Sequence, residues 1–156
     1  MSDKLIKFQI VTPERIVLED NVKQVTVPTQ MGEITVLPGH IPLVAVLKPG
    51  EIRAKKDGRE ILMAVSGGFI EVLKNKVVIL ADTAEMAEEI DEKRAEEARQ
   101  RAQKLKEEKR FDRVEFAALQ SQIEKELARL KVARKHRHRT GAPNPLEESE
   151  NNKYRI

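Results

Sequence analysis

The sequence contains no cysteine and no tryptophan among its 156 residues. Without cysteine, the chain has neither disulfides nor thiolate metal sites. Aromatic residues make up only 3% of the chain, which argues against a nucleic-acid surface that stacks bases on aromatic side chains. No apolar run is long enough to span a bilayer, and the start of the chain has neither an apolar signal core nor a transit peptide. We therefore expect a protein of the cytosol, or of the cytosolic side of a larger assembly.

Charged residues are abundant but nearly balanced, with 29 basic and 26 acidic side chains and a net charge of +3. A balance of this kind indicates a surface with many ion pairs rather than a nucleic-acid-binding surface.

Short alternating segments and turn signals fill the first half of the chain. Alternation of apolar and polar residues indicates half-buried strands, and Asp57-Gly58 is a strong tight-turn signal between two of them. Many short strands without an intervening helix predict an antiparallel β-sandwich or barrel. We assign a sandwich to residues 1–83. The expected strands are 6–10, 16–18, 22–27, 33–37, 43–47, 51–54, 60–65, 69–73 and 77–80.

From Ala84 the apolar period becomes helical. We expect Asp91 to cap the first main helix, a break within 108–112, and a second helix that packs antiparallel to the first. The hairpin is assigned to 84–136, and residues 137–156, which contain helix breakers, are expected to be disordered. The fold class is therefore α+β. Residues spaced by threes and fours form one stripe along each expected helix. The first stripe is Ala84, Ala87, Asp91, Ala95, Ala98, Ala102 and Leu105, and the second is Phe116, Leu119, Ile123, Leu127 and Leu130.

The first helix offers mostly alanine to its partner. A buried methyl contributes about 0.8 kcal/mol, against roughly 1.5–3 kcal/mol for a leucine or isoleucine side chain. The hairpin is therefore expected to undock at a cost of only a few kcal/mol.

An ordered set of short motifs resembles the epsilon subunit of bacterial F-type ATP synthase. The resemblance covers about residues 5–133 and implies a β-sandwich followed by a helical hairpin. The motifs are Val11-Thr12-Pro13-Glu14, Gly32-Glu33, Leu37-Pro38-Gly39-His40-Ile41-Pro42-Leu43, Lys48-Pro49-Gly50, Ser66-Gly67-Gly68-Phe69 with Glu71-Val72, and Leu80-Ala81-Asp82-Thr83-Ala84.

The resemblance implies a non-catalytic subunit of the rotating central stalk in a proton-translocating ATP synthase. Its sandwich would bind the gamma subunit and the ring of c subunits, with Glu33 and His40 at the ring-facing end. It would lie on the cytoplasmic face of the bacterial inner membrane, held there only through the complex.

In this family the hairpin is a brake on ATP hydrolysis that extends toward the catalytic alpha and beta subunits. The resemblance implies that basic residues on the second helix, here Lys131, Arg134 and Lys135, make the inhibitory contacts. The residues themselves equally allow a solvated helix end, where cations are favoured by the helix dipole.

In some members of the family ATP binds the folded hairpin through a motif that Ile90-Asp91-Glu92-Lys93-Arg94-Ala95 matches. No cofactor is required, so ATP would be a regulatory ligand. Convergent cations would hold the phosphates, although lysine at position 125 lacks the two-pronged geometry of arginine. The alternative is that these residues form surface ion pairs such as Glu97 with Arg101 and Glu126 with Arg129. The ATP-binding residues implied are Glu85, Ile90, Asp91, Arg94, Ala95, Arg101, Lys125 and Arg129.

Three other readings compete. The basic run 135–139 could bind nucleic acid without specificity, but it lacks a folded reading element. His136 and His138 could ligate a metal, but no carboxylate or cysteine lies near them in the sequence. The third keeps the family and makes the hairpin purely structural. We expect no enzyme activity, metal or nucleic acid for this chain.

Overall fold

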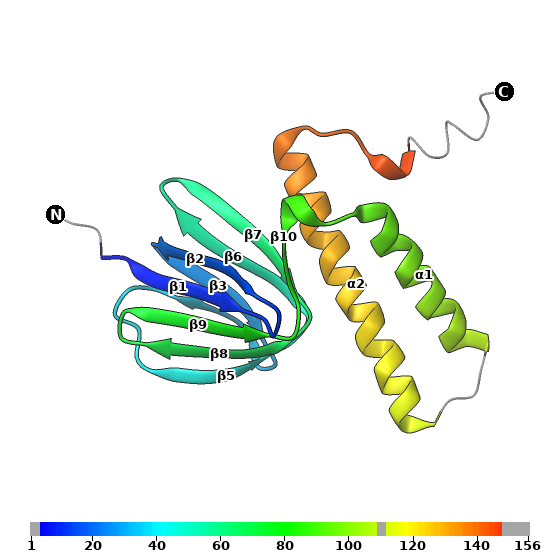
Figure 1. The fold of residues 1–156 in the computed structure, drawn as a ribbon, viewed down its shortest axis with the longest axis horizontal. Helices are drawn as coiled ribbons and strands as arrows, with labels where there is room; N and C mark the ends of the chain where they lie inside the picture. Colours follow the sequence, from blue (N-terminus) through cyan, green and yellow to red (C-terminus); the bar gives the residue numbers. More distant parts are fainter. Residues whose placement is uncertain (1–3, 109–111, 148–156) are drawn as a thin grey trace.

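Among the residues that the structure describes are a sheet of ten strands, the short 3-10 helix η1 and the α-helices α1 and α2 (Figure 1). The computed structural model describes residues 4–108 and 112–147. The helical elements are η1 (Ala87–Glu89), α1 (Glu92–Glu108) and α2 (Arg113–Thr140). The strands are β1 (Ile6–Val11), β2 (Ile16–Val22), β3 (Gln24–Thr29), β4 (Gly32–Val36), β5 (Leu43–Leu47), β6 (Gly50–Lys56), β7 (Arg59–Val65), β8 (Gly68–Leu73), β9 (Lys76–Ala81) and β10 (Ala84–Met86).

The sheet folds over on itself to give two layers. Its strand order is β10-β7-β6-β3-β5-β8-β9-β1-β2, and β4 pairs with β3 outside this path. The two halves join where β3 meets β5 through the single pair Thr29 and Leu47. All pairings are antiparallel except that of β1 with β9, which is parallel. The predicted sandwich is confirmed, with this one parallel pair as a departure from a purely antiparallel sheet.

Alternating side chains fill the space between the layers. Phe8 and Ile10 of β1 point inward while Gln9 between them is partly exposed, as the period of two in a strand requires. Ile52, Ile70 and Ile79 are fully buried against them. The Asp57-Gly58 turn has positive φ angles of 48° and 74°, which matches the tight hairpin expected there.

The helical pattern expected from Ala84 is wrong for its first three residues, and Ala87–Glu89 form a short 3-10 helix before α1 begins. Ala84–Met86 extends the sheet as β10, paired with β7, and Ala84 is buried beside the core of the sandwich. The free edge of β7 offers hydrogen-bond partners that a helix at this point would leave unused. The helix α1 begins at Glu92, and Asp91 caps it as expected, because its carboxylate accepts a hydrogen bond from the Arg94 backbone N–H at 3.1 Å.

The second helix is longer than expected. Asp112 caps its start by accepting hydrogen bonds from the backbone N–H groups of Val114 and Glu115. It ends at Thr140 with Gly141 in the left-handed conformation, φ 70°, four residues beyond the expected boundary at 136. Glycine adopts this conformation without steric cost, so it stops the helix where the basic run does not. Residues 148–156 of the expected disordered tail lie outside the described residues.

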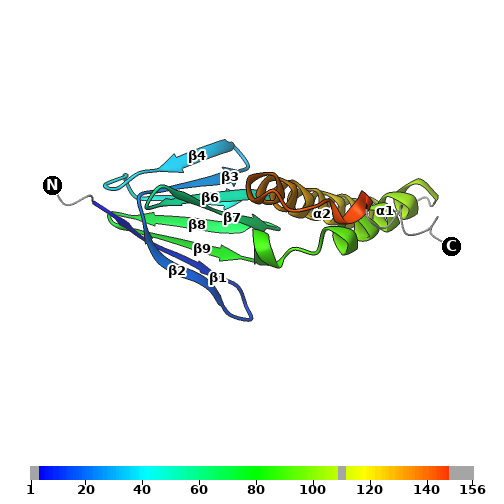
Figure 2. The same cartoon turned by 90° about the horizontal axis from the view of Figure 1, so that it is seen from above.

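Helix α2 lies between the sandwich and α1 (Figures 1 and 2). Ala95 and Ala102 of the first predicted stripe are buried, and so are Ile123 and Leu130 of the second. Leu127 of the second stripe is half exposed, because the described sandwich leaves a hollow beside it. Within the described residues, no helix has the length and apolar character needed to cross a membrane.

Candidate functional site

Five of the eight predicted nucleotide-binding residues line one hollow of about 350 Å³. It lies where β10, the start of α1 and the middle of α2 meet, and its size is within the range of small-molecule sites. The predicted residues in it are Glu85, Asp91, Arg94, Arg101 and Arg129.

Arg129 is already engaged by protein carboxylates. Its guanidinium donates hydrogen bonds to both oxygens of Glu85, at 2.6 and 3.1 Å, and to Glu126 at 2.7 Å. Burial lowers the pKa of Arg129, but these two carboxylates outweigh burial and raise that pKa above its ordinary value. The ion-pair alternative for Glu126 and Arg129 is therefore confirmed. A phosphate could reach Arg129 only by competing with two charge-assisted interactions.

Arg94 and Arg101 differ from Arg129 in their exposure and in their lack of described carboxylate partners. Both are exposed on α1, and neither guanidinium has a carboxylate partner among residues 4–108 and 112–147. The expected pair of Glu97 with Arg101 is not formed in this part of the chain, although both line the hollow. The hollow therefore presents two available cations on one helix face.

The other three predicted residues lie around the hollow. Lys125 lines a neighbouring hollow that shares Glu85 and Arg129 with the first. Ile90 and Ala95 are buried, so they support the site rather than line it.

The sequence analysis did not identify two residues at this site, Arg15 and Glu89. Arg15, in the turn between β1 and β2, lies 3.3 Å from Glu89, which lines the hollow, and it lines the neighbouring hollow itself. No helical period links position 15 to the hairpin. The only available signal was the motif Val11-Thr12-Pro13-Glu14, which ends just before Arg15.

The basic end of α2 makes ion pairs within the protein. Lys135 Nζ lies 2.7 Å from Glu51 Oε1 on β6, and Arg137 lies 2.6 Å from Glu92 on α1. Arg139 pairs with Glu60 on β7. Cations that are paired in this way are poorly available to nucleic-acid phosphates.

The remaining predicted inhibitory residues are less engaged. Arg134 lies 3.7 Å from Glu96 and is about half exposed, and Lys131 is exposed beside a hollow. His136 Nδ1 is 3.9 Å from Glu88. The described part of the chain holds no group of three or more side chains arranged for a metal ion.

Glu33 and His40 lie at opposite ends of β4. Glu33 is the second residue of that strand and accepts a hydrogen bond from Arg53, whereas His40 follows its end by four residues. His40 Nδ1 is 2.7 Å from the Ile41 carbonyl oxygen. The structure therefore does not bring the two predicted ring-facing residues together.

An apolar row crosses the outer face of the layer formed by β5, β8, β9, β1 and β2. Val46, Phe69 and Leu80 are cross-strand partners on β5, β8 and β9, with exposed fractions of 40%, 53% and 55%. Val11 is paired with Leu80, and Ile16 with Val11, so the row continues onto β1 and β2. An exposed row of this extent is typical of a surface that another protein covers.

Comparison with known families divides the chain into two matches. Residues 5–87 match the beta-sandwich domain of the ATP synthase delta/epsilon chain, and residues 88–134 match its long alpha-helix domain. The boundary falls after β10 and within η1, in agreement with the extension of the sheet beyond Thr83.

Several bacterial proteins are similar over most of their length. The ATP synthase epsilon chain of Chloroflexus aggregans is 46% identical over 132 residues, covering 85% of this chain and 94% of that protein. The one from Bacillus subtilis is 53% identical over 100 residues, covering 64% and 76%.

A solved structure supports the same grouping. A chain in the OSCP/F1/c-ring structure of the Euglena gracilis mitochondrial ATP synthase superposes with a TM-score of 0.71 at 25% identity, covering 80% of this chain and 79% of that one. On the two domain matches and the identity to the bacterial relatives, this chain belongs to the ATP synthase epsilon chain family.

Proposed function

We propose that this chain is a central-stalk subunit of a bacterial F-type ATP synthase and that its helical hairpin is a movable brake on ATP hydrolysis. The sandwich joins the gamma subunit and the c ring, and the chain itself carries out no catalysis. The complex keeps it at the cytoplasmic face of the inner membrane. A similar chain occurs in the OSCP/F1/c-ring structure of the Euglena gracilis mitochondrial ATP synthase, which supports a place in the stalk beside the c ring.

The observation that carries the brake is the small apolar contact between the hairpin and the sandwich, which ion pairs such as Lys135 with Glu51 and Arg139 with Glu60 supplement. Among the described residues, the core of the sandwich is a separate cluster that includes no residue of α1 or α2. In the part of the chain that the structure describes, α2 contributes Val132 and Ala133 to the second cluster, through which the hairpin meets the sandwich. Burial of these two side chains contributes about 2–4 kcal/mol, so release of the hairpin leaves the sandwich core intact.

The apolar row formed by Val46, Phe69 and Leu80 supports attachment to the stalk. It lies on β5, β8 and β9, whereas the main contacts of α2 with the sheet are to β6 and β7, so a partner can cover it whether the hairpin is docked or released. We assign the gamma subunit to this row. Glu33 and His40 are kept as contacts to gamma or the c ring, one at each end of β4.

The brake is tested in the reconstituted complex. A chain ended after Asp91 keeps the sandwich, β10 and η1, and it should assemble with gamma while ATP hydrolysis rises relative to the full chain. If the shortened chain fails to join gamma, the division between sandwich and hairpin is wrong. If it assembles and hydrolysis is unchanged, the hairpin is a structural part of the stalk.

A regulatory nucleotide in the hollow at the hairpin is the second part of the proposal. Arg94 and Arg101 supply available cations and Asp91 or Glu85 an acceptor for the adenine amino group or the ribose. Arg129 lines the hollow from α2, and Lys125, Ile90 and Ala95 complete the site from its neighbourhood. ATP bound there would bridge α1 and α2 and favour the docked state by its differential affinity.

ATP titration of the isolated full chain tests this site. ATP should raise Tm, and Arg94→Ala should remove the increase because a phosphate-binding cation is lost. Lys93→Ala is the matched control, since Lys93 is an exposed neighbour that does not line the hollow. An equal increase in Tm for both variants would contradict the assignment.

A further inference from the structure

The carboxylate of Glu51 is the most deeply buried charge at the contact between α2 and the sandwich. It lies on β6 and its side chain is 3% exposed. Its Oε1 accepts hydrogen bonds from Lys135 Nζ at 2.7 Å and from Arg53 NH1 at 3.1 Å. A buried charge is tolerated only when it is paired, so Glu51 favours the position of α2 that brings Lys135 to it.

Arg53 joins this pair to two further carboxylates. It donates a hydrogen bond to Glu33 and lies 3.9 Å from Glu60. Glu60 in turn pairs with Arg139 of α2. The sandwich thus holds three carboxylates around one arginine, and α2 brings the two cations that balance them. When α2 leaves, this cluster is left with an excess of two negative charges.

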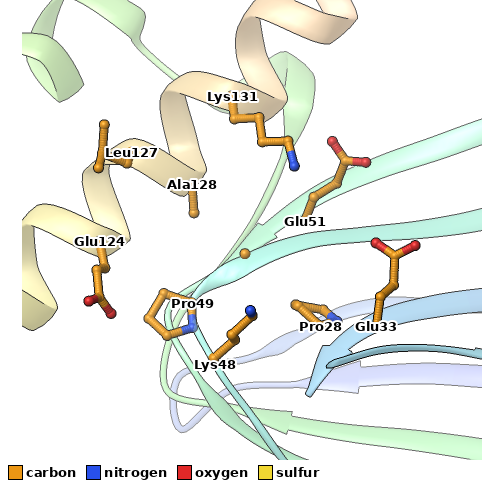
Figure 3. A pocket seen from close by; sticks show the side chains of 10 residues that line it. Pro28, Glu33, Lys48, Pro49, Glu51, Glu124, Leu127, Ala128 and Lys131 are labelled. Carbon is orange, nitrogen blue, oxygen red and sulfur yellow. The ribbon is translucent and has the colours of Figure 1, made fainter. Parts of the chain in front are cut away.

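The second oxygen of the Glu51 carboxylate is unsatisfied. Among the described residues, Glu51 Oε2 is buried without a hydrogen-bond partner. Glu51 and Lys131, which lies one helical turn before Lys135, line a common hollow of about 500 Å³. Lys131 reaches from α2 toward the Glu51 carboxylate (Figure 3). The side chain of Lys131 is flexible, so its ammonium group can move toward the Glu51 carboxylate while α2 stays docked.

We propose that Glu51 is the docked-state receptor for the inhibitory cations Lys131 and Lys135. Because one ammonium group cannot serve two carboxylate surfaces at once, binding to Glu51 keeps these lysines from the catalytic subunits. Arg53 also links this receptor to Glu33, so a partner that takes Glu33 from Arg53 strengthens the remaining pair with Glu51. The regulatory consequence rests on the proposed brake. The docking of Lys131 and Lys135 on Glu51, called the latch below, is a property of the isolated chain.

The latch is tested by measuring the ratio of released to docked hairpin in the isolated full chain. Since the chain has no cysteine, Asn75→Cys and Ser121→Cys place two distance labels, one on the sandwich and one on α2. Glu51→Gln should raise the ratio about tenfold, the scale of one charge-assisted hydrogen bond. Glu19→Gln is the control, because it breaks an exposed ion pair with Lys7 on β1, away from α2.

Two outcomes overturn the latch. One is an unchanged or lower ratio for Glu51→Gln. The other is strict additivity of the free-energy changes caused by Glu51→Gln and Lys135→Gln. If the two residues form one interaction, either substitution removes it, and the second substitution adds little. Lys135 is about one-third exposed, so Lys135→Gln keeps the test informative even if Glu51→Gln disturbs β6.

The two proposals fail separately. If Glu51→Gln releases the hairpin in the isolated chain but hydrolysis by the reconstituted complex does not fall, the latch holds and the brake is wrong. If the ratio is unchanged, the latch is wrong whatever the complex does. If the latch and the brake are both right, Glu51→Gln lowers hydrolysis and raising salt releases the hairpin of the unaltered chain more than that of Glu51→Gln.

Discussion

Gly68 occupies the closest approach between β8 and β9. Its φ is +130°, and a methyl group added to its Cα would lie 2.0 Å from the Leu80 carbonyl oxygen. Backbone atoms cannot move away as a flexible side chain can, so Gly68→Ala should lower the free energy of unfolding by more than about 3 kcal/mol. Denaturant unfolding followed by circular dichroism measures this change.

Gly67 provides a matched control for the clash. Its φ is +127°, almost the same as that of Gly68, but an added methyl would lie at ordinary contact distances, 3.6 Å from Asp82 Oδ2 and 3.7 Å from the Leu47 carbonyl oxygen. Gly67→Ala therefore adds backbone strain without the clash, at about 1–3 kcal/mol. Equal losses for the two variants would show that the conformation, and not the approach of β9, sets the requirement for glycine.

Single residues were predictable where a local interaction decides their role. Asp91 was expected to cap a helix, and it does, because a cap is fixed by residues two or three positions away. Arg129 was expected to hold a phosphate, whereas the structure pairs it with Glu85, 44 positions earlier in the chain. A pairing over this distance depends on the fold and leaves no pattern in the sequence.

At the scale of elements, docking of α2 should weaken in acid. Burial raises the pKa of Glu60 on β7, but the hydrogen bond from Arg139 and the charges of Arg139, Lys135 and Arg53 outweigh it and lower that pKa. Release of α2 removes Arg139 and Lys135, and the pKa of Glu60 returns toward its ordinary value. Its contribution to docking is therefore complete above about pH 4.3 and is lost as the pH falls through the lower docked-state pKa.

The distance labels on the sandwich and α2 measure this effect directly. The released fraction should rise as the pH is lowered below about 4, and Glu60→Gln should make the rise smaller. Asp20 provides the comparison, because the hydrogen bond from Lys56 lowers its pKa and both residues belong to the sandwich. Asp20→Asn should leave the released fraction at each pH unchanged. A pH profile that Glu60→Gln does not alter would contradict this account of docking.

The boundaries of elements were less predictable than their existence. The nine strands up to Ala81 and both helices follow from the apolar period, which depends on local side chains alone. The segment 84–86 has too few residues to show a period, and pairing with β7 decides its conformation. The end of α2 depends on Gly141, and the basic run before it stays helical with Arg137 paired to Glu92 and Arg139 to Glu60.

At the scale of the whole molecule, the described residues form two apolar cores, and strand β7 contributes residues to both. The larger fills the sandwich, and the smaller joins β7 to η1 and α2 through Leu62, Ala64, Ala87, Ile90, Val132 and Ala133. The sequence predicted two units, and it also predicted that the hairpin would be weakly held. It did not predict that the sandwich carries β10 and η1 with it, because both lie in the part that sequence periodicity assigns to the helices.

The point at which the chain is shortened should therefore decide the stability of the isolated sandwich. A chain ended after Thr83 loses β10, including the buried Ala84, and uncovers Leu62 and Ala64 of β7. A chain ended after Asp91 keeps these contacts, which contribute about 1–2 kcal/mol. For a domain of this size we expect the shorter chain to have a Tm lower by roughly 5–15 °C, measured by circular dichroism on heating. Equal Tm values would mean that residues 84–91 are held by the hairpin alone, and the sandwich would then end at Thr83.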